Sequence, residues 1–292
     1  MKIIKKIISL SCLLLLLSGP STLVNAHTSD KKQDHVQISI QLWSVKDDIK
    51  EDFKGTLKQI ADMGFDGVEF AGSFGPYKND PQGLKQFLDQ LGLKVSGAHV
   101  GFKNFKGNNF QKTVDFYKAL DAKMLIIPMD QRAFKANKVD AFISDLIALS
   151  ERLKPYGMQT GYHNHWQEFG SYNKTTFWDH IAASTPDEVI LQLDIGWVEY
   201  AGQDPVEYVK RYPGRTLTSH YKAKRMKGKY PSGKLPFIGQ DGTDWNAVIN
   251  AQLSQGGTEW FVVEQEEHPN GLTPLEAVKV SKQALDEMLA EI

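Results

Sequence analysis

The sequence of 292 residues contains a single cysteine, Cys12, and no excess of one charge, because 34 lysines and arginines stand against 35 acidic residues. A single cysteine excludes an intrachain disulfide. The near-neutral balance argues against nucleic-acid binding through a basic surface and against a polybasic membrane-surface protein. A content of 41% apolar residues is typical of a globular protein and excludes a disordered chain.

The N-terminus has the pattern of a targeting segment. A basic start leads into an apolar run from Ile7 to Leu17, which is too short to span a bilayer, and Val24-Asn25-Ala26 resembles a cleavage site. These features predict a secretory signal peptide over residues 1–26 and a disordered linker over 27–35. An uncleaved anchor is the alternative, whereas a lipoprotein is disfavoured because Cys12 lies inside the apolar run.

Cleavage would leave a cysteine-free chain of 266 residues with 31 basic and 35 acidic side chains, a net charge near −4. We therefore expect an exported protein, periplasmic or extracellular, that is stabilised by an ordinary apolar core. No later run approaches the length of a transmembrane helix, so we expect no stable membrane insertion after cleavage. The oligomeric state is not indicated by any feature of the sequence.

Short apolar runs alternate with longer segments that have apolar residues at helical spacing, such as Phe53, Leu57, Ile60 and Met63. This alternation predicts parallel strands joined by helices, and eight units over residues 36–292 have the size of a single-domain α/β protein, a (β/α)₈ TIM barrel. A doubly wound sheet is disfavoured because no glycine-rich loop follows the first run. The expected strands are 37–43, 67–70, 94–99, 124–128, 158–163, 189–194, 215–221 and 260–265.

Ionisable residues stand at or just after the ends of six of these eight strands. In a (β/α)₈ barrel those ends meet at one rim, where active sites lie. Burying such groups is costly unless they are paired or bind a metal, so a divalent ion held by carboxylates and imidazoles is the simplest account. The residues are Glu69, His99, His163, His165, Glu168, Asp194, His220, Lys222 and Glu264.

Mixed carboxylate and imidazole ligands suit transition metals better than Mg²⁺ or Ca²⁺, which prefer oxygen ligands alone. We expect one divalent ion, with Mn²⁺ favoured and Co²⁺, Fe²⁺, Ni²⁺ or Zn²⁺ as alternatives. No thiolate ligand is available once Cys12 is removed with the signal peptide.

An ordered set of short motifs occurs at successive strand ends. It includes Gln41-Leu42-Trp43-Ser44, Gly67-Val68-Glu69-Phe70, Tyr162-His163-Asn164-His165, Leu193-Asp194-Ile195-Gly196-Trp197, Ser219-His220-Tyr221-Lys222 and Val263-Glu264-Gln265. This set, over about residues 36–290, resembles the sugar phosphate isomerase/epimerase family of xylose isomerase-like TIM barrels. The resemblance is specific for the family and not for one substrate.

The resemblance implies one metal bound by Asp194, His220 and Glu264 together with an acid from the fifth strand. Here the chain departs from the family, because His163 stands where relatives often have Glu. His163 is therefore the expected fourth ligand, and Glu168 is the substitute if His163 does not bind. Replacing a carboxylate by an imidazole removes one negative charge and raises the net charge of the metal centre.

Such a metal site polarises a substrate carbonyl, so that a base can remove the neighbouring proton. Return of the proton gives isomerisation or epimerisation, and loss of a β-substituent gives elimination. The resemblance implies that Glu264 is both ligand and base, and Glu168, His165 and Lys222 are further acid/base candidates. Glu69 and His99 are expected to contact sugar hydroxyls, and Trp43 and Trp197 to stack on a sugar ring; structural hydrogen bonds and loop packing are the alternatives.

Export favours an unphosphorylated sugar or glycoside, since sugar phosphates are cytosolic. The long segment 222–242 after the seventh strand is expected to be a flap over the site. Both features favour glycosides, including 3-keto-glycosides, for which a lyase or hydratase reaction is the alternative to isomerisation. A non-catalytic sugar-binding barrel is a second alternative, while the negative charge argues against a DNA-directed nuclease.

Overall fold

The computed structural model describes residues 36–224 and 235–292. The predicted signal peptide (1–26) and linker (27–35) lie outside these residues, as does the middle of the predicted flap. Within the described ranges, no helix combines the length and the apolar character needed to cross a membrane.

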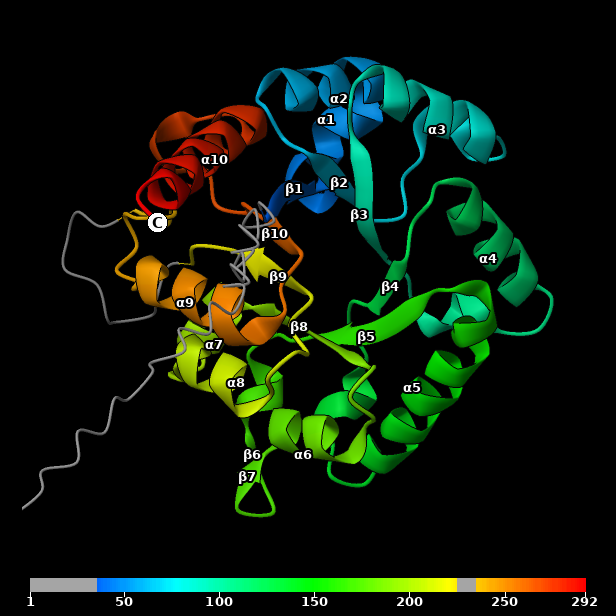
Figure 1. The fold of residues 1–292 in the computed structure, drawn as a ribbon, viewed down its shortest axis with the longest axis vertical. Coiled ribbons are helices and arrows are strands. Elements are labelled where there is room, and N and C mark those ends of the chain that lie inside the picture. Colours follow the sequence, from blue (N-terminus) through cyan, green and yellow to red (C-terminus); the bar gives the residue numbers. More distant parts are fainter. Residues whose placement is uncertain (1–35, 225–234) are drawn as a thin grey trace, which may run out of the picture. The chain divides into compact units, whose positions relative to one another are not determined.

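Eight parallel strands close into a barrel, in the order β1-β10-β9-β8-β5-β4-β3-β2 (Figure 1). The prediction of a (β/α)₈ barrel is thus confirmed, and each strand lies within three residues of its expected bounds. The strands are β1 (Gln37–Gln41), β2 (Gly67–Phe70), β3 (Lys94–His99), β4 (Met124–Ile127), β5 (Gln159–His163), β8 (Ile190–Asp194), β9 (Thr218–Tyr221) and β10 (Trp260–Val263).

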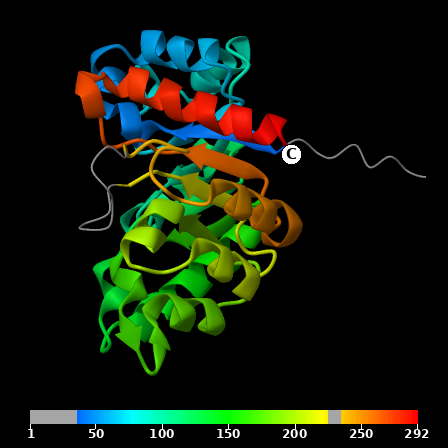
Figure 2. The same cartoon turned by 90° about the vertical axis from the view of Figure 1, so that its left-hand side faces the viewer.

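Helices surround the barrel and cover the outer face of the strands (Figure 1 and Figure 2). In α2, Asp52 caps the first turn by accepting a hydrogen bond from the Gly55 amide at 2.9 Å, and Leu57 and Ile60 are fully buried. The helices are α1 (Lys46–Glu51), α2 (Phe53–Asp62), α3 (Pro81–Gln90), α4 (Asn109–Ala119), α5 (Val139–Leu153), α6 (Phe177–Ser184), α7 (Ile195–Tyr200), α8 (Pro205–Arg211), α9 (Trp245–Ala251) and α10 (Pro274–Ala290).

A small antiparallel hairpin was not predicted from the sequence. It consists of β6 (Ser171–Tyr172) and β7 (Thr175–Thr176), and its turn residues Asn173 and Lys174 both have positive φ. Two residues per strand are too few to show an alternating pattern, so hydrophobic periodicity carries no signal for this element.

The barrel interior changes character along its axis. Alternate strand residues such as Leu125 and Phe261 belong to the main core under the helices. A separate apolar cluster contains Met124, Ile190 and Trp260. These residues occupy the alternate strand positions, which face the inside of the barrel. Toward the C-terminal ends of the strands the buried positions become polar, and they include Gln41, Glu69, Gln192 and His220.

Gly161 allows β5 and β8 to approach closely. A Cβ atom at this position would lie 2.1 Å from the carbonyl oxygen of Ile190, which is strand backbone and cannot move away cheaply. We therefore expect Gly161→Ala to lower the free energy of unfolding by about 2 kcal/mol. Gly101→Ala is the matched control, because its Cβ would meet nothing within 4 Å, and we expect a change below about 0.5 kcal/mol. Chemical denaturation of both variants measures the difference, and equal stabilities would contradict it.

Candidate metal centre

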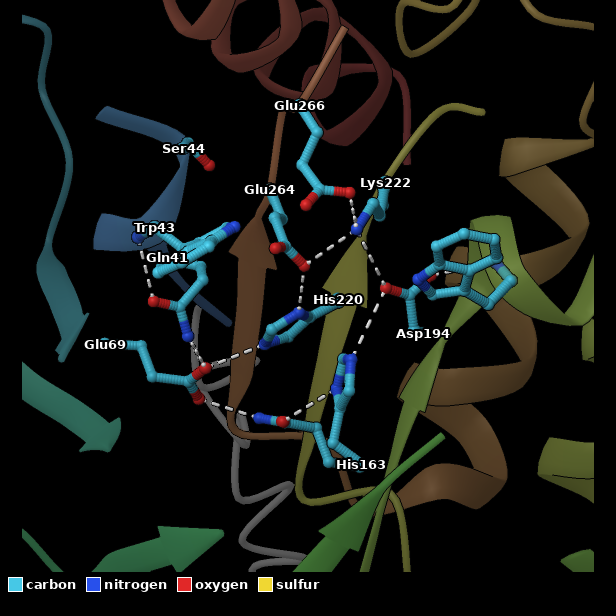
Figure 3. Close-up of polar contacts among 12 residues, drawn as sticks. Gln41, Trp43, Ser44, Glu69, His163, Asp194, His220, Lys222, Glu264 and Glu266 are labelled. Atoms are coloured by element: carbon cyan, nitrogen blue, oxygen red, sulfur yellow. Dashed lines mark hydrogen bonds and ion pairs between the residues drawn. The ribbon is translucent and has the colours of Figure 1, made fainter. Parts of the chain in front are cut away.

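Four side chains from neighbouring strand ends converge on one point. His163 ends β5, Asp194 ends β8, His220 lies in β9, and Glu264 follows β10. One ligand atom from each lies within 4.8 Å of the other three, and all four residues are buried (Figure 3). The sequence prediction brought together the same four residues, because parallel strands place their C-terminal ends at one rim.

The ends of β5 and β8 are held together by Asn164, which follows His163. Its side-chain oxygen accepts a hydrogen bond from the Asp194 amide at 2.9 Å, and its Nδ2 donates to the Asp194 carbonyl at 3.2 Å. One carboxylate oxygen of Asp194 then accepts a hydrogen bond from the Trp197 amide at 2.9 Å at the start of α7. The other oxygen is left to face the cluster.

This second oxygen, Asp194 Oδ2, is buried and has no hydrogen-bond partner among the described residues. Buried polar atoms are nearly always paired, so an orphaned carboxylate oxygen indicates a ligand-binding role. It lies 3.6 Å from His163 Nε2. The two carboxylates carry two negative charges, which balance a divalent cation, and the two imidazoles can bind it in their neutral form. The donor set therefore fits a divalent metal ion.

The tautomer of His163 also fits this role. Gln192 donates from Nε2 to the Glu69 carboxylate at 2.7 Å, so its oxygen must face the two histidines His163 and His99. His163 Nδ1 therefore donates to Gln192, and the Nε2 lone pair is free to point at the cluster. Burial lowers the pKa of His163 well below its usual range, which keeps the ring neutral.

His220 is the most heavily paired member of the cluster. Its Nδ1 lies 2.7 Å from Glu264 Oε2, and its Nε2 lies 2.7 Å from Glu69 Oε1. Burial disfavours the charged ring, but the carboxylates of Glu69 and Glu264 outweigh it and raise the pKa of His220 to about 10. Without a metal, His220 is therefore an imidazolium that donates to both carboxylates.

The two carboxylates of the cluster differ in their acidity. Burial raises the pKa of Asp194 to about 7, although Lys222 acts against this. Burial also favours a raised pKa for Glu264, but the charges of Lys222 and His220 outweigh burial and hold the pKa of this carboxyl below its usual range. A proton on Asp194 thus competes with a cation near neutral pH, whereas Glu264 stays ionised.

Glu69 was expected to contact sugar hydroxyls, and the structure places its side chain away from the cavity surface. The side chain is fully buried, and its oxygens accept hydrogen bonds from Gln41 at 2.6 Å, from Gln192 and from His220. It does not line the pocket, because it lies behind His220 as seen from the cluster (Figure 3). Glu69 is therefore a positioning residue that orients His220.

Glu168 also differs from its expected role. Its carboxylate is fully buried, accepts a hydrogen bond from Tyr162 Oη at 2.6 Å and another from the His165 amide at 2.9 Å, and does not line the pocket. These bonds hold the loop after β5, so Glu168 is placed neither as the substitute metal ligand nor as an acid or base at the site.

A cavity of about 340 Å³ opens above the cluster. Seven predicted site residues line it, and Asp194 and His220 lie beneath its surface, fully buried. Glu266, Ala71, Pro128 and Met129 also line it and were not among the predicted site residues. The predicted residues that line it are Trp43, His99, His163, His165, Trp197, Lys222 and Glu264.

Lys222 is a buried residue and not a solvated surface lysine. Its ammonium nitrogen lies 3.4 Å from Glu264 Oε2, 3.7 Å from Asp194 Oδ2, and within ion-pair distance of Glu266. These acids outweigh burial and raise the pKa of Lys222, so it stays charged. Glu266 follows Glu264 by two residues, and a period-two pattern on the strand end was the signal that could have found it.

His165 differs from the other histidines of the site because it lines the cavity without a carboxylate partner for its ring among the described residues. Its Nδ1 is buried and has no hydrogen-bond partner there either. Burial and the charge of Lys222 lower the pKa of His165 to about 4, so the ring is neutral at physiological pH. A neutral imidazole in a cavity can accept a proton.

Comparison with known proteins agrees with the fold. Residues 57–290 match the family model described as xylose isomerase-like TIM barrel. An inosose dehydratase of Lacticaseibacillus casei is 26% identical over 270 residues, which cover 80% of this chain and 89% of the relative.

Two solved structures illustrate the similarity of fold. A sugar phosphate isomerase/epimerase from Parabacteroides distasonis has a TM-score of 0.71 at 22% identity and covers 86% of this chain and 95% of its own. The IOLI protein with a bound zinc atom has a TM-score of 0.66 at 19% identity, and covers 87% of this chain and 98% of its own.

We expect the protein to bind one equivalent of Mn²⁺ or Zn²⁺ and to release protons as it does so. The metal displaces the proton of His220, whose pKa is about 10, and below pH 7 also that of Asp194, so affinity falls as the pH is lowered. Calorimetric titration in buffers of different ionisation enthalpy measures both quantities.

Asp194→Ala and Glu264→Ala should abolish metal binding in the same titration. Glu207→Ala, which removes an exposed carboxylate on α8, is the control and should bind normally. Unchanged affinity in both cluster variants would contradict the assignment of the site.

Proposed function

The chain belongs to the xylose isomerase-like TIM barrel family, and we propose that it is a divalent-metal-dependent enzyme of the isomerase/epimerase type that removes a proton next to a carbonyl of an unphosphorylated sugar or glycoside. The relatives confirm the prediction of a carbohydrate-modifying enzyme, since they are inosose dehydratases. The observation that carries the proposal is the buried cluster of His163, Asp194, His220 and Glu264 beneath a cavity with charged walls.

When bound, the divalent ion supplies Lewis acidity toward a substrate carbonyl. Mn²⁺ remains our first expectation for its identity. His163, Asp194, His220 and Glu264 are the residues that would hold it, and Glu69 fixes the ring of His220 from behind.

We assign the other cavity residues by charge state. His165 lines the cavity and its ring is neutral, so we assign to it the acceptance of the proton from carbon, in place of the base role expected for Glu264. Lys222 stays charged and stabilises the negative charge that develops on the substrate oxygen. Glu266 holds the Lys222 ammonium on the cavity side of Glu264. Trp43 and Trp197 offer apolar faces for a sugar ring.

Elimination is the second candidate reaction. The curated relatives are named dehydratases, which remove water, and elimination shares its first step with isomerisation. The proton removed from carbon leaves with the hydroxyl as water, and the charged Lys222 beside Glu266 at the cavity wall is suited to stabilise the departing oxygen. This supports the lyase or hydratase alternative on 3-keto-glycosides.

We propose that residues 1–26 are a signal peptide and that the enzyme acts outside the cytoplasm, which is the reason to favour unphosphorylated substrates. Cleavage after Ala26 leaves His27 as the first residue of the mature protein. N-terminal sequencing of protein purified from the producing cells tests this, and a chain that still begins at Met1 would contradict it.

The reaction is tested with Mn²⁺-loaded protein in D₂O. We expect deuterium to enter the substrate carbon next to the carbonyl, because proton removal is the first step of isomerisation, epimerisation and elimination alike. Free ketoses, 3-keto-glycosides and inosose are compared by NMR. Exchange with a new stereocentre or carbonyl position indicates an isomerase or epimerase, and loss of water or of the glycosidic group indicates a lyase. No exchange with any of the three would leave the sugar-binding alternative.

The same assay tests the base. His165→Gln should lower kcat by about a hundredfold or more without changing the bound metal, because it removes the proton acceptor and no ligand. His180→Gln is the matched control, since His180 lies on α6 with an exposed partner, Asp140, and should retain full activity. Equal activity of the two variants would return the base role to Glu264.

A further inference from the structure

A second cavity of about 730 Å³ lies beside the metal cavity. Its walls come from the end of α1, from the loop between β2 and α3, from the end of β3 and the segment after it, and from one face of α4. Its apolar part contains Phe74 and Phe116, whose rings pack at 4.5 Å between centroids, together with Tyr117. The volume is large enough for a sugar ring and its substituents.

The charged residues that line this cavity all have the same sign. They are Lys50, Lys78, Lys103 and Lys112, and no aspartate or glutamate of the described residues lines the cavity. All four lysines are exposed, and none has an ion pair with another residue of the described ranges. Four like charges that line one cavity create a local positive potential, which favours an anionic ligand.

The two cavities share one lining residue, His99. The neighbouring residues Ala71 and Gly72 line the metal cavity and the second cavity respectively. A ligand that occupies the metal cavity can therefore extend past His99 into the second one. His99 donates from Nε2 to Gln192, which fixes the ring at this boundary.

We propose that the second cavity, which we name the lysine cavity after its residues Lys50, Lys78, Lys103 and Lys112, binds an oxyanion substituent of the carbohydrate substrate. The substrate would then be an acidic sugar or glycoside whose neutral reacting ring lies over the metal cluster. The proposal extends the proposed function and rests on it, because it names a class of substrate for the same site.

The choice of lysine indicates what kind of anion is recognised. An ammonium group acts as a point charge, whereas the planar fork of arginine selects carboxylate or phosphate geometry, and none of the described arginines lines this cavity. The lysine cavity therefore recognises negative charge on a flexible substituent, which a carboxylate or a sulfate on an unphosphorylated substrate can supply. The aromatic residues at its base favour an attached sugar over a free ion.

Binding is tested by calorimetry on the full chain without added metal, so that the outcome does not depend on turnover. The probes are cellobiose and its derivatives with a carboxylate, a sulfate or a phosphate at C6 of the non-reducing ring, and inorganic phosphate alone. We expect the charged disaccharides to bind about tenfold more tightly than cellobiose at low salt, as a few exposed ion pairs would give, and the advantage to shrink as salt is raised. The order of the three derivatives identifies the preferred anion, and a preference for the phosphate would contradict the unphosphorylated substrate of the proposed function.

Lys103→Gln/Lys112→Gln should remove most of this advantage and leave cellobiose binding unchanged. Lys118→Gln/Lys138→Gln is the matched control, because it removes the same charge from exposed lysines that do not line the cavity. Equal affinity for charged and neutral disaccharides would overturn the proposal, as would an equal loss in the control variant.

Tight binding of inorganic phosphate alone would identify a free-anion site and overturn the role in carbohydrate recognition. If the charge preference holds while the protein neither binds metal nor exchanges deuterium, the proposed function fails and the lysine cavity stands as a binding site.

Discussion

The buried contact between His220 and two carboxylates is the constraint on which the site depends. Glu69 and Glu264 lie 2.7 Å from the two ring nitrogens, so the ring cannot rotate without losing a charge-assisted hydrogen bond in a fully buried environment. The same contact sets the charge of His220 and helps to hold Glu264 ionised. Because Glu69 is in turn held by Gln41 and Gln192, the ring orientation is transmitted from β1, β2 and β8.

Closure of the barrel makes this arrangement possible. Apolar residues such as Met124 and Trp260 fill one end of the interior, which leaves the other end to polar side chains that are paired with one another. Asp194 Oδ2 accepts no hydrogen bond within the described residues, and it belongs to the group of ligand atoms that lie close together. The charge of Lys222 at the cavity wall lowers the pKa of both Glu264 and His165. Glu264 therefore stays ionised and the ring of His165 stays neutral.

The two cavities divide recognition between them. The metal cavity has a mixed lining with paired charges, and the lysine cavity has a single sign of charge over an apolar base. His99 lines both cavities, and the segment after β3 lines the lysine cavity. Residues of this segment can therefore contribute to substrate specificity without altering the reacting centre. This division agrees with the general behaviour of (β/α)₈ barrels, in which loops change specificity while the strand ends keep the chemistry.

The strand periodicity, the order of the strands and the four converging residues His163, Asp194, His220 and Glu264 followed from the sequence, because buried parallel strands have a strong local signal and their ends meet at one rim. The short hairpin of β6 and β7 has too few residues for such a signal.

The direction in which each side chain points was decided only by tertiary packing. Glu69 stands at an expected strand end but binds His220 from another strand, and Glu168, in the loop after β5, binds Tyr162 of that strand. Glu266 instead lines the cavity beside Lys222. The clustering of four lysines from separate loops is likewise invisible in the sequence, because charge from distant segments adds up only where the fold brings it together.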